Sequence, residues 1–295
     1  MTGANRIDDI FERLEGKAAF IPYITCGYPN LETSRRLLHL LDANGAHIIE
    51  LGVPYSDPLA DGPVIQQASQ RALDNGTRLQ DVIELAARAR SEGLKAGLIL
   101  FSYFNPLLQY GLPRLFQSLR QVGIDGLIVP DLPVDESATV LQLADESYIH
   151  LIPLAAPTSL SRLDRIVPAA RGMIYCVSSL GVTGVRQQFH SRLEMLLAAL
   201  RQRTRLPLVV GFGVSNHQQF RQLARQCDGV VVGSALIREI QRHEAAFLSG
   251  TTAEMTGAER QLGAFVQQLV RGQDDGNVLH STPEHVNDKN INISN

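Results

Sequence analysis

Two carboxylates, Glu50 and Asp61, lie near the ends of a short segment with three prolines, ELGVPYSDPLADGP at residues 50–63. Glu50 follows the apolar run 46–49, whereas Asp61 falls in the loop after it, which also carries Asp57 and no basic residue. A carboxylate at the end of a buried strand and another on a loop have different surroundings. Their pKa values can therefore differ, so that one acts as an acid and the other as a base. The pattern predicts acid–base chemistry at Glu50 and Asp61.

Each of these acids also fits a role without chemistry. Glu50 fits a structural acid in an ion pair, although a glutamate that closes an apolar strand is more often functional. Asp61 precedes Gly62, and such pairs are common in turns. Asp57 precedes Pro58, and that position favours a structural or interfacial role over a chemical one.

The elements that must position these acids alternate between short apolar runs and longer amphipathic segments, which indicates parallel strands joined by helices. Eight such strand–helix units favour a closed (β/α)8 barrel (a TIM barrel) over an open doubly wound sheet. The lack of a Gly-x-Gly-x-x-Gly turn after the first apolar run favours it as well. The expected strands are 18–25, 46–52, 96–101, 125–130, 148–154, 172–177, 207–211 and 229–233. The expected helices are 31–43, 79–90, 112–121, 134–146, 160–169, 190–202, 216–226 and 234–247.

The ends of the chain complete this picture. An amphipathic helix is expected within residues 1–15 and one more helix at 255–271, whereas the sequence after Gly272 is polar. We therefore expect one barrel domain over residues 1–271 and a disordered tail at 272–295. Helix N-caps are predicted at Asn30, at Ser161 (with Asp164 three residues on) and at Ser215-Asn216.

Composition excludes several classes of partner. The 295 residues carry a net charge of −3 and no basic block, so no nucleic acid partner is expected. No apolar run reaches the roughly 20 residues that span a membrane, and none resembles a signal peptide, so a cytoplasmic location is expected. The three cysteines are predicted to be buried free thiols; they are Cys26, Cys176 and Cys227.

Two glycine-rich strand ends suggest where a phosphate would bind. Gly211-Phe212-Gly213 and Gly233-Ser234 follow the seventh and eighth expected strands and precede helices. Backbone N–H groups and helix N-termini bind phosphate without a lysine, and this is the usual phosphate site of such barrels. Ordinary tight turns are the alternative for both segments.

The lysine and histidine positions exclude two rival mechanisms. Lys17 and Lys95 each precede a strand, and Lys289 lies in the tail, so neither a Schiff base nor pyridoxal phosphate chemistry has a lysine at a strand's C-terminal end. The eight histidines form no His-x-His or His-x-x-x-His pair, and even the best placed, His217, fits the first turn of a helix. No metal site is therefore predicted. The mechanism that remains is acid–base catalysis by carboxylates on a phosphorylated substrate.

Six motifs in fixed order carry a family resemblance. Segment 50–63 is followed by YFNP, VPDLP, GVTGVR, GFGVS and GSA, which begin at residues 103, 129, 181, 211 and 233. Together they resemble the tryptophan synthase alpha chain family over roughly residues 7–271. Two departures are Tyr28, where many members carry Asp, and Ser179-Leu180, which replaces an arginine-containing pair of some members.

The resemblance implies a (β/α)8 barrel that cleaves indole-3-glycerol phosphate to indole and D-glyceraldehyde 3-phosphate, a retro-aldol reaction. It assigns proton transfer to Glu50 and contact with the indole N–H to Asp61. It assigns Thr183 to a mobile loop that closes over the substrate. Other substrate-binding positions are Tyr23, Thr25, Tyr103 and Tyr175. The phosphate-binding positions are Gly184, Gly213, Gly233 and Ser234.

The resemblance also implies a partner. Members of the family pair with a beta chain that holds pyridoxal phosphate, in an α–β–β–α heterotetramer, while the alpha chain itself needs no cofactor. Asp57, Pro58 and Asp131 match positions that face this partner, although Asp131 taken alone is ambiguous. Two alternatives are a free-standing lyase that releases indole without a beta chain, and a non-catalytic barrel that binds a phosphorylated ligand or activates a partner.

Overall fold

The computed structural model describes residues 5–177, 186–211 and 213–272, with only the backbone of 186–190. Nine strands form one sheet in which every paired strand is parallel, in the order β5-β4-β3-β2-β1-β9-β8-β7-β6. The strands are β1 (Ala19–Thr25), β2 (Ile48–Gly52), β3 (Gly97–Phe101), β4 (Gly126–Ile128), β5 (His150–Leu151), β6 (Leu154–Ala155), β7 (Ile174–Val177), β8 (Leu208–Gly211) and β9 (Gly229–Val232).

The two edge strands of this sheet are neighbours in the chain, because only Ile152 and Pro153 separate β5 from β6. The Ile152 N–H donates to the Leu127 carbonyl of β4 at 2.9 Å, while the Pro153 carbonyl accepts from the Tyr175 N–H of β7 at 3.1 Å. The sheet is therefore curled, as in a TIM-like α/β fold.

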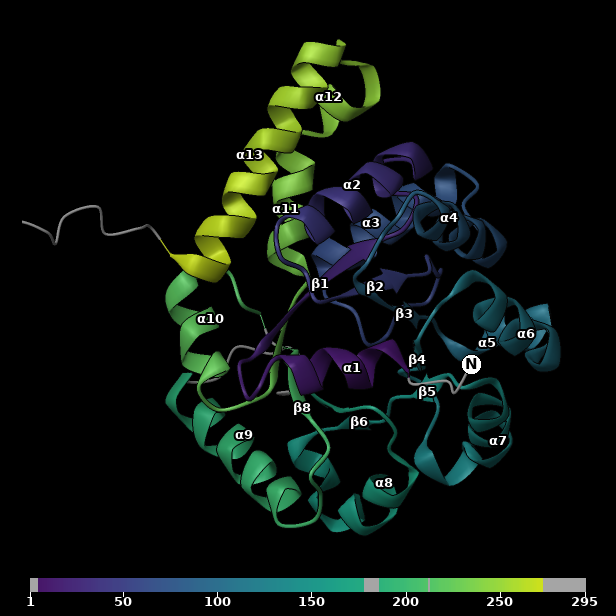
Figure 1. Ribbon diagram of the computed structural model, residues 1–295, viewed down its shortest axis with the longest axis vertical. Helices are drawn as coiled ribbons and strands as arrows, with labels where there is room; N and C mark the ends of the chain where they lie inside the picture. Colours follow the sequence, from purple (N-terminus) through teal and green to yellow (C-terminus); the bar gives the residue numbers. More distant parts are fainter. Residues whose placement is uncertain (1–4, 178–185, 212, 273–295) are drawn as a thin grey trace, which may run out of the picture.

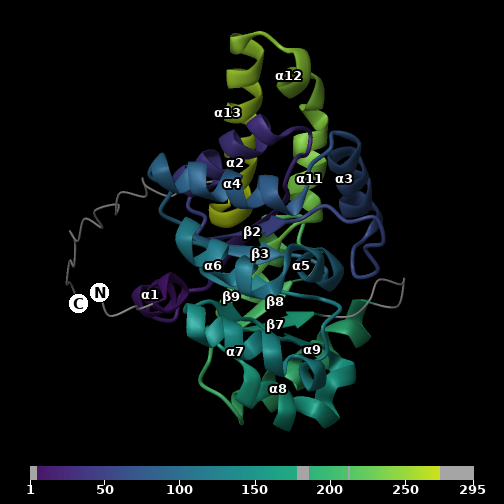
Figure 2. The ribbon, with the colours of Figure 1, turned by 90° about the vertical axis from the view of Figure 1, so that its right-hand side faces the viewer.

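Helices surround the curled sheet, and one helix, α1, crosses its centre (Figure 1). At one end α12 and part of α13 extend away from the strands (Figure 2). The α-helices are α1 (Arg6–Arg13), α2 (Leu31–Ala43), α3 (Pro63–Asp74), α4 (Leu79–Ser91), α5 (Phe104–Tyr110), α6 (Leu112–Val122), α7 (Ala138–Ser147), α8 (Leu163–Ala169), α9 (Arg186–Arg201), α10 (His217–Ala224), α11 (Ser234–Arg242), α12 (Glu244–Ser249) and α13 (Thr252–Arg271). Two 3₁₀ helices are η1 (Val134–Glu136) and η2 (Pro157–Arg162).

The expected strands are found where the apolar runs predict them, except that run 148–154 is divided between β5 and β6. Helices α3 and α5 were not expected. Each has a proline in its first turn, at Pro63 and Pro106, where the missing N–H breaks no intrahelical bond. The expected helix 234–247 is divided at His243 into α11 and α12.

Two of the three predicted N-caps are confirmed. The Asn30 side chain accepts from the Thr33 N–H, and the Asn216 side chain accepts from the Gln219 N–H. The prediction at Ser161 is wrong, because this residue lies within η2, which leads directly into α8.

The core has two parts, one on each side of the sheet. Outward side chains pack beneath the surrounding helices, and inward ones fill the interior. Helix α1 adds Ile7 and Ile10 to the interior. A Cβ atom at Gly126 would lie 3.0 Å from Ile7 Cδ1, so this strand position needs a glycine for α1 to pack closely. Helix α1 thus closes one end of the interior.

A buried acid, Asp125, fixes this closed end. Its Oδ2 accepts from Arg90 Nη2 at 2.9 Å and from the Leu98 N–H at 2.8 Å, and its Oδ1 pairs with Arg6 of α1. The same carboxylate therefore joins α1, α4 and β3, and both of its oxygens have cationic partners.

The predicted state of the cysteines is confirmed, since Cys26, Cys176 and Cys227 are buried and free. Within the part of the chain that the structure describes, no helix has the length and apolar character needed to cross a membrane. The predicted tail, from residue 273 onward, lies outside the described residues.

Candidate active site

Glu50 projects into the interior from the middle of β2. It lies two residues after Ile48, an interior residue, so strand alternation turns both side chains to the same side. The side chain is 1% exposed, and Oε1 has no hydrogen-bond partner. Burial raises the pKa of Glu50 from 4.5 to about 8. Glu50 is therefore mostly a neutral acid at pH 7 and has a proton to give.

Asp61 lies on the loop between β2 and α3 and is only partly buried. The Tyr103 hydroxyl donates to Asp61 Oδ2 at 3.2 Å and accepts from the Ala60 N–H at 2.9 Å. Burial raises the pKa of Asp61 from 3.8 to about 6, and the Tyr103 hydrogen bond opposes this rise. Asp61 is therefore mostly ionised at pH 7, where Glu50 is not.

Two buried tyrosines lie near these acids. Tyr23 of β1 pairs in register with Glu50, and Tyr175 comes from β7. Burial raises the pKa of each phenol well above 10, and the charges of Asp61 and Glu50 raise both further. Both hydroxyls therefore stay protonated and can act as donors. Thr25, buried at the end of β1, lies beside Tyr23.

Apolar side chains complete the wall around this polar group. Phe101, at the end of β3, packs edge-on against Tyr23 with ring centroids 5.7 Å apart. Ile65, Leu154 and Val177 also pack against the interior and are only partly buried. Such a wall suits a flat aromatic ligand. Sequence reasoning did not select these four residues, although three of them lie near the C-terminal ends of expected strands.

The predicted phosphate positions lie on neighbouring strand ends. Gly213 follows β8 and is exposed; its φ is +34°, and no atom lies within 4 Å of the place its Cβ would take. Gly233 follows β9, and a Cβ there would lie 3.6 Å from Tyr23 and from Ile65. Ser234 is the first residue of α11. Thr183 and Gly184 lie outside the described residues.

Asp57 and Pro58 lie in the loop after β2, and Asp131 lies in the loop after β4. Asp57 is exposed and accepts from Ser56 Oγ at 3.0 Å. Asp131 is exposed and accepts from the Phe104 N–H of α5 at 2.9 Å. Between Pro58 and Asp61, the Leu59 side chain is 89% exposed.

The ionisable groups of this site are carboxylates and phenols. Among the described residues no group of three or more His, Cys, Asp or Glu side chains could hold a metal ion. Lys17 and Lys95 precede β1 and β3, at the ends of the strands opposite to the loop of Asp61. A neutral carboxylic acid, an anion and two phenols thus lie close together, with Gly233 beside Tyr23.

Comparison with known proteins agrees with this geometry. A family model described as "Tryptophan synthase alpha chain" matches residues 11–267. The tryptophan synthase alpha chain of Chloroflexus aggregans is 46% identical over 84% of this chain and 95% of its own length. The tryptophan synthase alpha chain of Synechococcus elongatus is 50% identical over 80% of this chain and 90% of its own length.

Solved structures extend the agreement to three dimensions. Tryptophan synthase subunit alpha from Legionella pneumophila has a TM-score of 0.80 and 34% identity, over 90% of this chain and 97% of its own. A chain of the aminoacrylate-bound M. tuberculosis tryptophan synthase has a TM-score of 0.78 and 33% identity, over 91% of this chain and 99% of its own. The chain therefore belongs to the tryptophan synthase alpha chain family.

Proposed function

We propose that this chain is the alpha subunit of a tryptophan synthase and cleaves indole-3-glycerol phosphate to indole and D-glyceraldehyde 3-phosphate. One observation carries the assignment of the site residues. Glu50 and Asp61 occupy one interior, yet burial raises their pKa values to about 8 and about 6. At pH 7 the pair therefore offers one acidic proton and one negative charge.

Glu50 transfers the proton in this proposal. Its carboxylic acid protonates the indole ring carbon that bears the glycerol chain, because indole leaves poorly as a carbanion. The resulting carboxylate then accepts the proton of the side-chain hydroxyl as the carbon–carbon bond breaks. The aldehyde forms, indole keeps the first proton, and Glu50 ends protonated as it began.

Asp61 holds charge. Protonation of the ring carbon places positive charge on the indole nitrogen, and an ionised Asp61 facing the N–H stabilises it. Tyr23, Thr25, Tyr103 and Tyr175 line the space for the substrate. Thr183 belongs to the loop that the resemblance assigns to closure over this space.

The phosphate binds at the C-terminal ends of β8 and β9 in this proposal. The N–H groups at Gly184, Gly213, Gly233 and Ser234 supply donors, and the N-terminus of α11 adds a favourable dipole. The position of Gly233 beside Tyr23 supports one continuous site for the indole and its phosphate tail.

We also propose that β5 and β6 are two halves of one interrupted strand. The sheet is then an eight-stranded (β/α)8 barrel, and residues 1–271 form a single domain followed by a polar tail at 272–295. The bonds of Ile152 to β4 and of Pro153 to β7 support this count, because they continue the pairing across the interruption.

A beta chain is the proposed partner, in an α₂β₂ heterotetramer where pyridoxal phosphate belongs to the beta chain. Leu59, Leu108 and Leu160 are 89%, 50% and 39% exposed, and all three follow C-terminal ends of strands. Leu59 directly follows Pro58, and an exposed apolar side chain there fits a protein contact better than open solvent. A free-standing lyase is not favoured, since the matched relatives are named alpha chains.

The test is Glu50→Gln in the full chain, measured with and without a beta chain. Turnover should fall by roughly 10²–10⁴-fold, because the amide keeps the shape but has no acidic proton. Binding of an analogue that lacks the reacting hydroxyl should persist. Turnover near the wild-type rate would make Glu50 the wrong residue and favour a non-catalytic barrel. Full wild-type activity alone, unchanged by the beta chain, would exclude the subunit role.

A further inference from the structure

The hydroxyl of Tyr103 contacts the acidic loop rather than only the substrate space. It donates to Asp61 Oδ2 at 3.2 Å and accepts the Ala60 N–H at 2.9 Å, and its side chain is 3% exposed. Asp61 otherwise makes only main-chain bonds in the described residues, from its N–H to Pro58 and from Gln66 to its carbonyl. Tyr103 is therefore the side chain that fixes the direction of this carboxylate.

The ring of Tyr103 is fixed as well. It stacks on Tyr55, near the start of the same loop, with centroids 4.9 Å apart and planes 23° apart. Tyr55 in turn is bound to α3, since its N–H donates to Ser69 Oγ at 2.9 Å and its carbonyl accepts from that hydroxyl at 3.2 Å. Both ends of the loop thus depend on Tyr103 or on its stacking partner.

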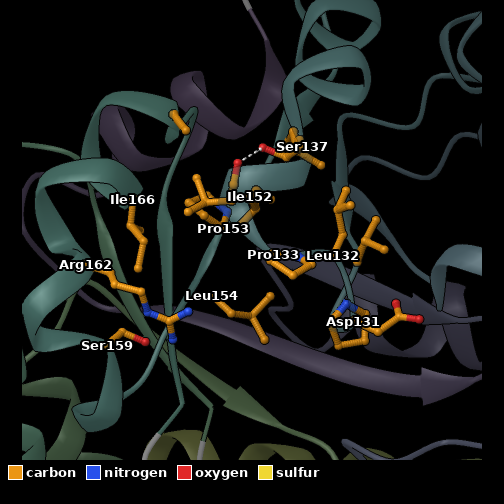
Figure 3. A pocket seen from close by; sticks show the side chains of 15 residues that line it. Asp131, Leu132, Pro133, Ser137, Ile152, Pro153, Leu154, Ser159, Arg162 and Ile166 are labelled. Atoms are coloured by element: carbon orange, nitrogen blue, oxygen red, sulfur yellow. Dashed lines mark hydrogen bonds between the residues drawn. The ribbon is translucent and has the colours of Figure 1, made fainter.

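The backbone of Tyr103 is held from the neighbouring strand end. Ser102 Oγ donates to the Tyr103 carbonyl at 3.0 Å, and Asp131 Oδ1 accepts from the next N–H, that of Phe104, at 2.9 Å. Asp131 belongs to the loop after β4. It lies at one side of a pocket of about 280 Å³, opposite Arg162 (Figure 3).

We propose that Asp131 and Tyr103 are positioning residues for Asp61. Asp131 fixes the backbone after Tyr103, and the Tyr103 hydroxyl fixes the carboxylate that faces the indole nitrogen. The inference rests on the proposed function and adds a role to each residue. Because Asp131 lies on the face proposed for the beta chain, this series of contacts also joins that face to the reaction.

The titratable groups around Asp61 define what a pH profile reports. They are Glu50 of β2, Tyr23 of β1, Tyr103 beside α5 and Tyr175 of β7. Of these, only Tyr103 lowers the pKa of Asp61, through its hydrogen bond. Loss of this hydroxyl therefore raises the pKa of Asp61, and the low-pH limb of activity moves to higher pH.

The first test is Tyr103→Phe in the full chain, which keeps the stacked ring and removes the hydroxyl. We expect kcat to fall about tenfold to a hundredfold with little change in KM, since a misplaced group near the reaction costs this much. The low-pH limb of kcat should move upward, and a carboxyl NMR titration should show the same shift. The matched control is Tyr110→Phe in α5, whose hydroxyl contacts Gln80 and Ser118 instead.

The second test separates acceptor from charge at Asp131. Asp131→Asn keeps an oxygen that can accept the Phe104 N–H, whereas Asp131→Ala does not. We expect Asp131→Ala to move the limb in the same direction as Tyr103→Phe, and Asp131→Asn to restore most of the wild-type profile. Asp135→Ala, in η1 of the same loop and ion-paired with Arg165, is the control.

The inference would be overturned if Tyr103→Phe had the wild-type kcat and an unshifted low-pH limb in its activity profile. The inference would also be overturned if Asp131→Ala and Asp131→Asn changed kcat and its pH profile equally, and only when the beta chain is present. That result would assign Asp131 to partner contact alone. A wild-type chain that cleaves no indole-3-glycerol phosphate, alone or with a beta chain, would instead overturn the proposed function and this inference with it.

Discussion

The hydroxyl of Tyr23 lies against the main chain of Gly52 on the neighbouring strand. A Cβ atom at position 52 would lie 2.1 Å from Tyr23 Oη and 2.4 Å from its Cζ. The interior therefore has room for this tyrosine only because residue 52 has no side chain.

Gly52→Ala is accordingly expected to destabilise the protein by about 1–3 kcal/mol, since the new methyl group must displace a buried ring. Urea unfolding measures the loss. Gly62→Ala, where no atom lies within 4 Å, is the control and should stay within about 0.5 kcal/mol. The double variant Gly52→Ala/Tyr23→Ala should lose less stability than the sum of the two single losses, because the new methyl group no longer meets the ring. Strict additivity of the two changes would contradict the steric explanation.

The pH dependence of kcat should be bell-shaped. Asp61 works as an anion, so activity falls as pH drops through its pKa of about 6. Glu50 works as an acid, so activity falls as pH rises through its pKa of about 8. Initial rates of indole formation between about pH 5 and 9 measure both limbs. A profile that keeps rising above pH 8 would show that Glu50 does not act as the proton donor.

Glu50→Gln should also make the fold more stable at neutral pH. Because burial raises the pKa of Glu50 above its ordinary 4.5, wild type loses stability as pH rises from about 4.5 toward about 8, and the amide does not titrate. We expect the variant to gain on the order of 1–3 kcal/mol at pH 7. Unfolding in urea across this range measures the difference. The same difference at pH 4.5 and pH 8 would argue against a buried neutral Glu50.

Gly213→Leu should raise KM about tenfold to a hundredfold with a smaller effect on kcat, because its side chain would occupy the proposed phosphate site. The control is Gly213→Ala, which has the same positive φ and hence the same backbone strain, but a much smaller side chain. Steady-state kinetics of both variants measure the effect. If the two variants share one KM, strain and not blockage is the cause.

Asp125→Ala should lower the free energy of unfolding by on the order of 3 kcal/mol, because Arg90 would remain buried without its carboxylate. Asp145→Ala breaks an exposed ion pair with Arg171 and should cost less than about 1 kcal/mol. Chemical unfolding compares the two. Below its melting temperature, Asp125→Ala should form indole at the wild-type rate, since Asp125 lies at the end of the interior that α1 closes. A loss equal to that of Asp145→Ala would contradict the buried network.

The sequence predicts the strands well, because runs such as 96–101 are continuously apolar and bounded by polar residues. It also predicts that Glu50 is unusual, since the residue interrupts such a run. Helix α3 is missed because its polar residues dilute the helical pattern, and α5 because Asn105-Pro106 indicates a turn. The Ser161 cap fails because local sequence does not distinguish a 3₁₀ turn from the residue before a helix.

Contacts between distant segments are what sequence alone does not provide. The bond from Tyr103 to Asp61 and the bond from Asp131 to Phe104 join residues 42 and 27 positions apart. Burial of each carboxyl, and hence its pKa, depends on the same packing. The motif therefore indicates which residues matter, whereas the fold determines the protonation state in which each one works.

The closed end at α1 has a consequence for the movement of molecules. Ile7 and Ile10 belong to the same interior cluster as Tyr23 and Tyr175 and pack against Gly97 and Gly126, the first residues of β3 and β4, so α1 covers the end of the interior opposite the loops after the strands. In the proposed reaction, the substrate and both products therefore pass the loops after the strands. The aldehyde carries its phosphate, but indole is apolar and uncharged. A partner docked on those loops would thus meet indole before bulk water does.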